Sequence, residues 1–443
     1  MRADEICQLV LRTCKAEGVA DAVVAVTQSE NTMVRFSNNQ ITVTNALQEA
    51  SAFIFVADSG RKAGTNIADL SKRTLVNTSK KVVESAKRGP SGDVSAPLPK
   101  GPFNYEPALL ENNPVPMEAK KLVSYVKEGM DAALGQGAER VAGSLIADNS
   151  RVTLQTSAGA FGVAKKSSLE LSLRAFQSSL ASGHAVRISG SEQDFRPSEA
   201  GEEAGRMAVL AKDPVNIEPG QYEAVLGPLV FADLVQHAGR MASAFSVDAG
   251  FSFLTGKMGQ KVCSEQLTVC DDATLPGAYG SYAFDSEGLP TRRTAIIEKG
   301  VLKSYLHNSA TAKKFGVEST ANAGLVAPHA FNLTVDAGTR SVDELIRSVD
   351  KGIYVTNNWY LRYQNMQTGD FSTIPRDAMF LIENGQIGKS IKEMRISDNV
   401  LRILSDTSAL STERKWIKWW EVEIPVLAPT ALVNGLKFTR SRM

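Results

Sequence analysis

Histidine is the residue type best suited to hold a catalytic metal, and this chain of 443 residues contains only four. They are His184, His237, His307 and His329. A helical zinc protease site needs two histidines about one turn apart, with a glutamate beside the first as general base. None of the four has a second histidine within a turn, so the sequence holds no self-sufficient zinc motif of this kind. A site assembled from distant residues, such as His237, His307 and Asp285, remains open as an alternative.

Other common catalytic patterns are also missing. No serine lies in a G-x-S-x-G turn, and no glycine-rich run matches a phosphate-binding loop. The cysteines are Cys7, Cys14, Cys263 and Cys270, and neither pair has the spacing of a zinc ribbon or a redox site. Burial as small core residues is the favoured interpretation of all four, and free thiols fit the reducing cytoplasm.

Two groups of polar residues are candidates for binding. Asp285 and Glu287 lie in a loop-like stretch that could serve acid–base chemistry, hold a cation or anchor a turn, and the turn is favoured. Trp359, Arg362 and Asn365 lie in a run of aromatic and amide side chains suited to gripping an extended peptide or a partner. The alternative for that run is an ordinary strand pair with an aromatic core.

The composition indicates a globular protein without an obvious charged partner. Lys and Arg number 49 and Asp and Glu 48, so the net charge of +1 gives no reason to expect nucleic-acid binding. No apolar run approaches the length of a membrane span, and the first residues do not form a signal peptide. We expect a cytoplasmic protein.

The order of predicted elements gives an α+β fold in two domains. Residues 1–213 show helix, strands and helix twice, which predicts an N-terminal α/β-sandwich-like domain made of two halves. A Pro- and Gly-rich stretch over 89–116 marks a boundary or linker between the halves. Residues 214–443 predict a mostly β domain, with its main helix over 229–244.

Several C-terminal segments resemble the TldD/PmbA family. The matching stretches run over 284–316, 319–324 and 368–399, and include FDSEGLPTRR, IIEKGVLKSYL and TGDFS. Members of one type in this family carry His-Glu-x-x-x-His and cut peptides, whereas PmbA- or TldE-like members lack it and pair with the first type. The resemblance places the metal helix over 229–244, where His237 stands near the first ligand but Ala238 occupies the glutamate position.

The resemblance implies a noncatalytic, metal-free subunit of an intracellular zinc protease, with zinc in a TldD-like partner and small unfolded or leader peptides as substrates. Members have also been called modulators of DNA gyrase. A homodimer is expected when the chain is isolated, because related subunits share surfaces. The segment from Trp416 to Trp420 is expected to form a packed helix or a partner contact. The alternatives are a solo peptidase with an unrecognised site and a stand-alone peptide-binding module.

Overall fold

The computed structural model describes residues 1–92 and 95–440 and contains two sheets with helices packed on them. Two residues of the predicted linker, 93 and 94, and the last three residues of the chain lie outside the described part. The mixture of helices and strands, with an α/β region first and a strand-rich region after it, confirms the predicted α+β class.

The N-terminal region contains one six-stranded sheet in the order β3-β2-β1-β4-β5-β6. Each half of the region consists of a helix, three strands and a second helix, with a short helix between the halves. The elements of the first half are α1 (Ala3–Ala16), β1 (Asp21–Ser37), β2 (Gln40–Asp58), β3 (Arg61–Ile67) and α2 (Lys72–Arg88). Then follow α3 (Pro107–Leu110), α4 (Ala119–Gly135), β4 (Arg140–Thr156), β5 (Phe161–Phe176), β6 (Ser182–Ser189) and α5 (Pro197–Leu210).

The two halves meet along their longest strands. β1 and β4 are antiparallel and pair from Val23 with Thr156 to Phe36 with Gly143. Both strands have 17 residues, so the middle of one lies against the middle of the other. This arrangement gives the sheet a local two-fold relation between its halves, as the repeated order of elements predicts.

β1 and β4 are longer than the apolar runs in the sequence indicate, because each run covers only part of a strand. Val24 and Val26 pack under α1 and α2, whereas Val34 and Phe36 pack under α4 and α5. Between these two apolar patches, polar residues such as Gln28 line a cavity of about 770 Å³, whose wall also includes residues 111–114. The polar middle therefore interrupts the apolar pattern without interrupting the strand.

Glycine also misled the prediction at one position. A glycine between two strand-like runs predicts a turn, but Gly162 lies in β5 beneath the ring of Phe284 from the other domain. A Cβ atom at Gly162 would lie 2.5 Å from Cε1 of that ring. Glycine is needed there because the two domains approach closely, and not because the chain turns.

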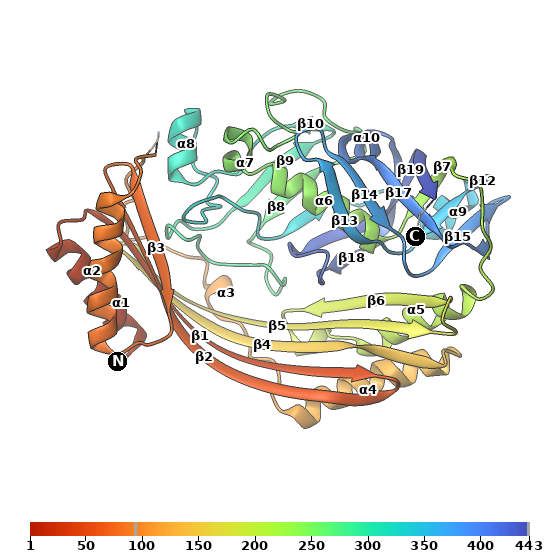
Figure 1. Cartoon of the computed structure of the whole chain (residues 1–443), viewed down its shortest axis with the longest axis horizontal. Coiled ribbons are helices and arrows are strands. Elements are labelled where there is room, and N and C mark those ends of the chain that lie inside the picture. Colours follow the sequence, from red (N-terminus) through yellow and green to blue (C-terminus); the bar gives the residue numbers. More distant parts are fainter. Residues whose placement is uncertain (93–94, 441–443) are drawn as a thin grey trace.

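The C-terminal region is built on a 13-stranded sheet whose longest member is β19 (Val426–Arg440). β19 pairs with four other strands, and Figure 1 shows this region lying above the concave side of the N-terminal sheet. The other strands are β7 (Gly220–Leu226), β8 (Val269–Asp272), β9 (Arg293–Glu298), β10 (Val301–Leu302), β11 (Leu333–Val335), β12 (Lys351–Val355), β13 (Trp359–Asn365), β14 (Asp370–Ile374), β15 (Met379–Glu383), β16 (Gln386–Ser390), β17 (Met394–Asn399) and β18 (Thr407–Ile417).

The helices of this region are few and short, as predicted. They are α6 (Pro228–Met241), α7 (Ala244–Asp248), α8 (Ser309–Phe315), α9 (Val342–Arg347) and α10 (Val400–Ser405). The predicted helix over 229–244 is divided, since α6 ends at Met241 and α7 follows. No helix in the described part of the chain is long and apolar enough to span a membrane.

Candidate functional site

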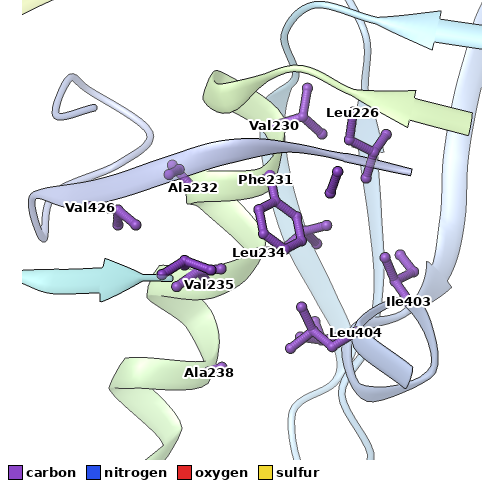
Figure 2. Packing of buried hydrophobic residues seen from close by; sticks show 14 of the residues in the cluster. Leu226, Val230, Phe231, Ala232, Leu234, Val235, Ala238, Ile403, Leu404 and Val426 are labelled. Carbon is purple, nitrogen blue, oxygen red and sulfur yellow. The ribbon is translucent and has the colours of Figure 1, made fainter. Parts of the chain in front are cut away.

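Helix α6 is the central helix of the C-terminal core. Pro228 occupies its first turn, where the missing N–H costs nothing. Phe231 and Val235 are fully buried, and Figure 2 shows apolar side chains from neighbouring elements around them. Gly239 allows close packing, because a Cβ there would lie 2.4 Å from Cδ1 of Leu333. The helix is therefore fixed by apolar contacts around most of its circumference.

Asp233 is a buried carboxyl group on this otherwise apolar helix. Its Oδ1 accepts a hydrogen bond of 2.7 Å from Nε2 of Gln236, and its Oδ2 accepts one of 2.6 Å from Nδ2 of Asn358. The residue is completely shielded from solvent, and this burial raises the pKa of the carboxyl from 3.8 to about 7. The two amide donors offset part of that effect by favouring the charged form.

His237 lies one turn further along the same helix. Its Nε2 is 3.5 Å from Oδ1 of Asp233, and its ring meets that of Tyr363 edge to face at 5.0 Å. Burial, together with the nearby Arg240 and Arg362, lowers the pKa of the imidazole from 6.5 to about 3. The ring is therefore neutral at neutral pH, so the contact with Asp233 is not an ion pair.

The structure thus adds Asp233, Gln236 and Asn358 to His237, and sequence reasoning missed all three. The available signal was a carboxylate inside an apolar helix, four residues before the histidine and on the same face. Three buried polar atoms of this cluster have no hydrogen-bond partner among the described residues: Nδ1 of His237, Oδ1 of Asn358 and the hydroxyl of Tyr363.

The described residues contain no group of three or more His, Cys, Asp or Glu side chains placed to hold a metal ion. The alternative site built from His237, His307 and Asp285 is therefore not assembled. The other histidines have separate surroundings. His184 bonds Ser172 across its own sheet, and His307 contacts Thr311 in the next turn.

Asp285 and Glu287 occupy one buried loop. One oxygen of Asp285 accepts the backbone N–H groups of Glu287 and Leu289, and the other accepts that of Ala323 at 3.0 Å. Glu287 accepts from both the backbone N–H and the hydroxyl of Ser309. Burial raises the pKa of the Asp285 carboxyl to about 7. Both side chains have partners within the chain that hold the loop in place, and a role in binding stays a prediction for them.

Trp359 begins a strand pair and belongs to a group of aromatic residues at the domain boundary. β13 and β14 are antiparallel, so the run of 354–372 does contain the strand pair considered as an alternative. The ring of Trp359 lies 4.8 Å from that of Trp419, 5.8 Å from that of Trp420 and 6.0 Å from that of Tyr360. We call these four residues the aromatic cluster.

The outer part of the aromatic cluster faces solvent. Trp420 is 58% exposed and Tyr360 is 38% exposed, and their rings lie 5.4 Å apart. Tyr360 has a φ of 59°, in the left-handed region that a bulky residue rarely adopts. Its backbone N–H donates to Glu421, which fixes this conformation. An exposed aromatic residue with a strained backbone is more typical of a binding surface than of a protein core.

Two basic side chains border this surface. Arg376 lies 5.7 Å from the ring centre of Trp359, and Arg362 lies 5.7 Å from that of Tyr360. Arg362 is also 3.6 Å from Glu421. Asn365, at the far end of β13, is exposed and accepts the N–H of Gln367 in the turn that follows.

The segment over 416–420 was expected to form a packed helix or a partner contact; the helix is wrong, and the partner contact stays a prediction. Trp416 and Ile417 are the last residues of β18, and the chain turns before β19. Trp419 is buried at 2% exposure and its ring packs on His184 of the N-terminal sheet at 4.6 Å. Trp419 is therefore buried at the domain boundary, whereas the next residue, Trp420, is exposed to solvent.

Asp377 connects the aromatic cluster to the N-terminal sheet. It accepts hydrogen bonds of 2.6 Å from Arg174 and Ser182 of that sheet, and from Asn357 and the indole N–H of Trp359 at 2.6 and 2.9 Å. The neighbouring charge of Arg174 helps to hold the pKa of the carboxyl below its usual value although burial opposes this. No residue pattern predicted this buried link.

Residues 219–440, half of the chain, match the model of the PmbA/TldA metallopeptidase C-terminal domain. The chain belongs to the PmbA/TldD family. A metalloprotease of Methanocaldococcus jannaschii is 33% identical over 204 residues, which cover 44% of this chain and 44% of the relative. A metalloprotease TldD homolog of Buchnera aphidicola is 30% identical over 235 residues, 51% of this chain and 48% of the relative. The matches therefore span about half the length of these curated relatives.

Solved structures of this family share the fold over the whole chain. TldE from Thermococcus kodakarensis has a TM-score of 0.82 at 20% identity and covers 98% of this chain and 99% of its own. A Thermotoga maritima protein named as a candidate modulator of a DNA gyrase has a TM-score of 0.83 at 22% identity, covering 99% and 100%. The predicted resemblance to the TldD/PmbA family is confirmed.

Helix α6 does not offer the donors that a family zinc centre would need. The six residues from Ala232 to His237 keep an acid second and a histidine sixth, as in His-Glu-x-x-x-His, but alanine stands first. This alignment differs from the one predicted, which placed His237 near the first ligand. One imidazole remains where three protein ligands are usual, and both oxygens of Asp233 are engaged by amides. The residues present therefore do not fit a zinc ion.

Proposed function

We propose that this chain is the noncatalytic subunit of a TldD/TldE-type metalloprotease whose zinc centre lies in a TldD-like partner. The observation that carries the proposal is the composition of α6. Ala232 cannot bind a metal, and the oxygens of Asp233 already accept hydrogen bonds from Gln236 and Asn358. The helix is buried along most of its length, and its polar residues bond within this chain.

In this proposal the subunit contributes to holding small unfolded or leader peptides. The aromatic cluster supports that role, because Trp420 and Tyr360 present ring area to solvent while Arg362 and Arg376 supply donors beside it. Aromatic rings and arginine are the side chains most often found to carry binding energy at protein surfaces. The subunit acts in the cytoplasm, which agrees with four buried free cysteines among the described residues.

The first experiment is to purify the chain alone and measure its zinc content and its cleavage of unstructured peptides. We expect less than stoichiometric zinc and no cleavage. Addition of a TldD-like subunit from the same cell is expected to give cleavage that a chelator abolishes. Stoichiometric zinc in the isolated chain, with cleavage lost on chelation, would contradict the proposal.

A solo peptidase with an unrecognised site predicts a different outcome for single substitutions. If the isolated chain cleaves peptides, His237→Gln and Asp285→Asn should each be measured in soluble, folded form. Loss of turnover with unchanged folding in either variant favours the solo enzyme. Unchanged turnover in both removes this version of it.

The exposed part of the aromatic cluster also supports a second candidate, a peptide-binding module that acts without a protease. The two functions differ in what accompanies the chain in its own cell. A TldD-like subunit that co-purifies in a fixed ratio supports the two-component protease. Peptide binding by the chain with no such subunit in the preparation supports the module.

A further inference from the structure

The aromatic cluster is assembled from two segments that are far apart in the sequence. Trp359 and Tyr360 begin β13, whereas Trp419 and Trp420 lie in the loop over 418–425 between β18 and β19. We call this loop the tryptophan loop. The spacing of the four rings depends on the groups that hold the tryptophan loop against the start of β13.

Gln236 of α6 holds the tryptophan loop by its main chain. Its Nε2 donates a hydrogen bond to the carbonyl of Glu421, and its Oε1 accepts the backbone N–H of Glu423 at 2.9 Å. One buried amide therefore satisfies a donor and an acceptor of the loop, as a neighbouring strand would. Because Glu421 directly follows Trp420, these bonds fix the backbone beside the most exposed ring of the aromatic cluster.

Asn358 holds the other segment in a similar way. This fully buried residue directly precedes Trp359, and its Nδ2 donates to the hydroxyl of Thr373 on β14 at 3.1 Å. The Thr373 hydroxyl in turn donates to the carbonyl of Trp359 at 2.8 Å. The start of β13 is therefore fixed by side-chain bonds where the ladder between β13 and β14 is irregular.

Asp233 of α6 joins these two holding groups. As described above, one of its oxygens accepts from Gln236 and the other accepts from Asn358. The carboxyl is completely shielded from solvent, so water does not replace either bond. A single side chain of α6 thus connects the residue that holds the tryptophan loop to the residue that precedes Trp359.

We propose that Asp233 and Gln236 are positioning residues for peptide binding, because they set the spacing of the exposed Trp420 and Tyr360 rings. These rings lie 5.4 Å apart and nearly perpendicular, so an apolar side chain of a peptide can pack against both. The inference rests on the proposed peptide-holding role of the aromatic cluster. The helix whose residues do not fit a zinc ion then has a second use, which is to support a binding surface.

The proposal is tested by removing the hydrogen bonds of each segment separately. Gln236→Leu removes the bonds to the tryptophan loop, and Asn358→Leu removes those at the start of β13. The probe is a synthetic peptide with one phenylalanine in a Gly- and Ser-rich sequence, which is unstructured when free. By titration calorimetry, each folded variant is expected to bind it at least about tenfold more weakly than the wild type.

The matched control is Val230→Ala, which opens a space in the same helix. Val230 is buried among apolar side chains of the core (Figure 2), so this variant should lose stability without losing affinity for the peptide. If Gln236→Leu does not fold, Gln236→Glu replaces it. Glutamate has nearly the same shape, but in its ionised form it cannot donate to the Glu421 carbonyl, and weaker peptide binding is again expected.

Circular dichroism supplies a readout that lower stability alone does not change. Neighbouring indole rings give a coupled signal that depends on their spacing and orientation, and Trp420 lies 5.8 Å from Trp359. The difference between the wild type and Trp420→Phe isolates the contribution of Trp420. This contribution should be lost in Gln236→Leu, measured against the same variant carrying Trp420→Phe, and should persist in Val230→Ala.

The two readouts separate this inference from the proposed peptide-holding role. A Trp420 signal that persists in Gln236→Leu overturns the positioning role, whatever the affinity for the peptide. A signal that is lost while peptide affinity is unchanged, or a wild type that does not bind the peptide, overturns the peptide-holding role of the cluster. Equal loss of affinity in Val230→Ala and Gln236→Leu also overturns the positioning role, because general destabilisation then accounts for both.

Discussion

The polar residues around α6 and the aromatic cluster at the domain boundary differ in how far their side chains are buried. Asp233 and His237 are buried, and the carboxylate is engaged by neighbouring amides. Trp420 and Tyr360 are exposed, and Tyr360 holds a backbone conformation that costs free energy. Residue types that are typical of a catalytic site therefore lie in the core of this chain, whereas aromatic residue types that are typical of a core lie on its surface. Residue type alone does not separate the two clusters; burial does.

The largest expected effect is on stability when the buried cluster is opened. Asp233→Ala removes the acceptor shared by Gln236 and Asn358 and leaves a space in a fully buried helix face. We expect the free energy of unfolding to fall by about 2–3 kcal/mol, measured by urea denaturation. Arg362→Ala serves as the control, because this largely exposed residue should change stability by less than about 0.5 kcal/mol. Equal losses of unfolding free energy in the two variants would contradict the predicted difference between the buried and the exposed residues.

The second prediction concerns pH. Burial raises the pKa of Asp233 from 3.8 to about 7, so its contribution to stability is present at low pH and is lost as pH rises through this window. Burial lowers the pKa of His237 from 6.5 to about 3, so its contribution is present above pH 6.5 and is lost as pH falls. Between about pH 4 and 6.5 the folded pair and the unfolded pair each hold one proton, and the two dependences cancel.

Single substitutions at His237 and Asp233 should reveal the pH dependence of stability that the remaining residue of the pair contributes. Relative to the wild type, the unfolding free energy of His237→Gln should fall with rising pH by about 1.4 kcal/mol per unit between about pH 4 and 6.5. That of Asp233→Asn should rise by a similar amount over the same range. Denaturation at several pH values measures both slopes, and parallel curves for all three proteins would show that the two groups are not buried as described.

The smallest expected effect on stability comes from relieving strain at Tyr360. Glycine adopts a φ of 59° without steric cost, so Tyr360→Gly should leave the unfolding free energy within about 1 kcal/mol of the wild type. The same substitution should weaken peptide or partner binding, because it removes a ring that contacts Trp420. Trp420→Ala is the companion variant, with the same expected direction. Unchanged binding in both, measured by titration calorimetry, would place the binding surface elsewhere.

The sequence predicted the fold class and the family, because these depend on the order of elements and on local motifs. It predicted a central helix over 229–244 for the same reason. It did not predict Asp377, whose partners come from both domains and are about 200 residues away in the case of Arg174 and Ser182. Such contacts leave no periodic pattern. The continuous strands were missed because the polar middle of β1 lines a cavity, so burial varies along one strand.

The pairing of β1 with β4 has an evolutionary consequence. Each half of the N-terminal region leaves one long strand edge that only the other half covers, from Val23 with Thr156 to Phe36 with Gly143. A separate half would therefore fold stably only as a symmetric pair. This geometry is what duplication and fusion of a gene for a small homodimeric ancestor would produce.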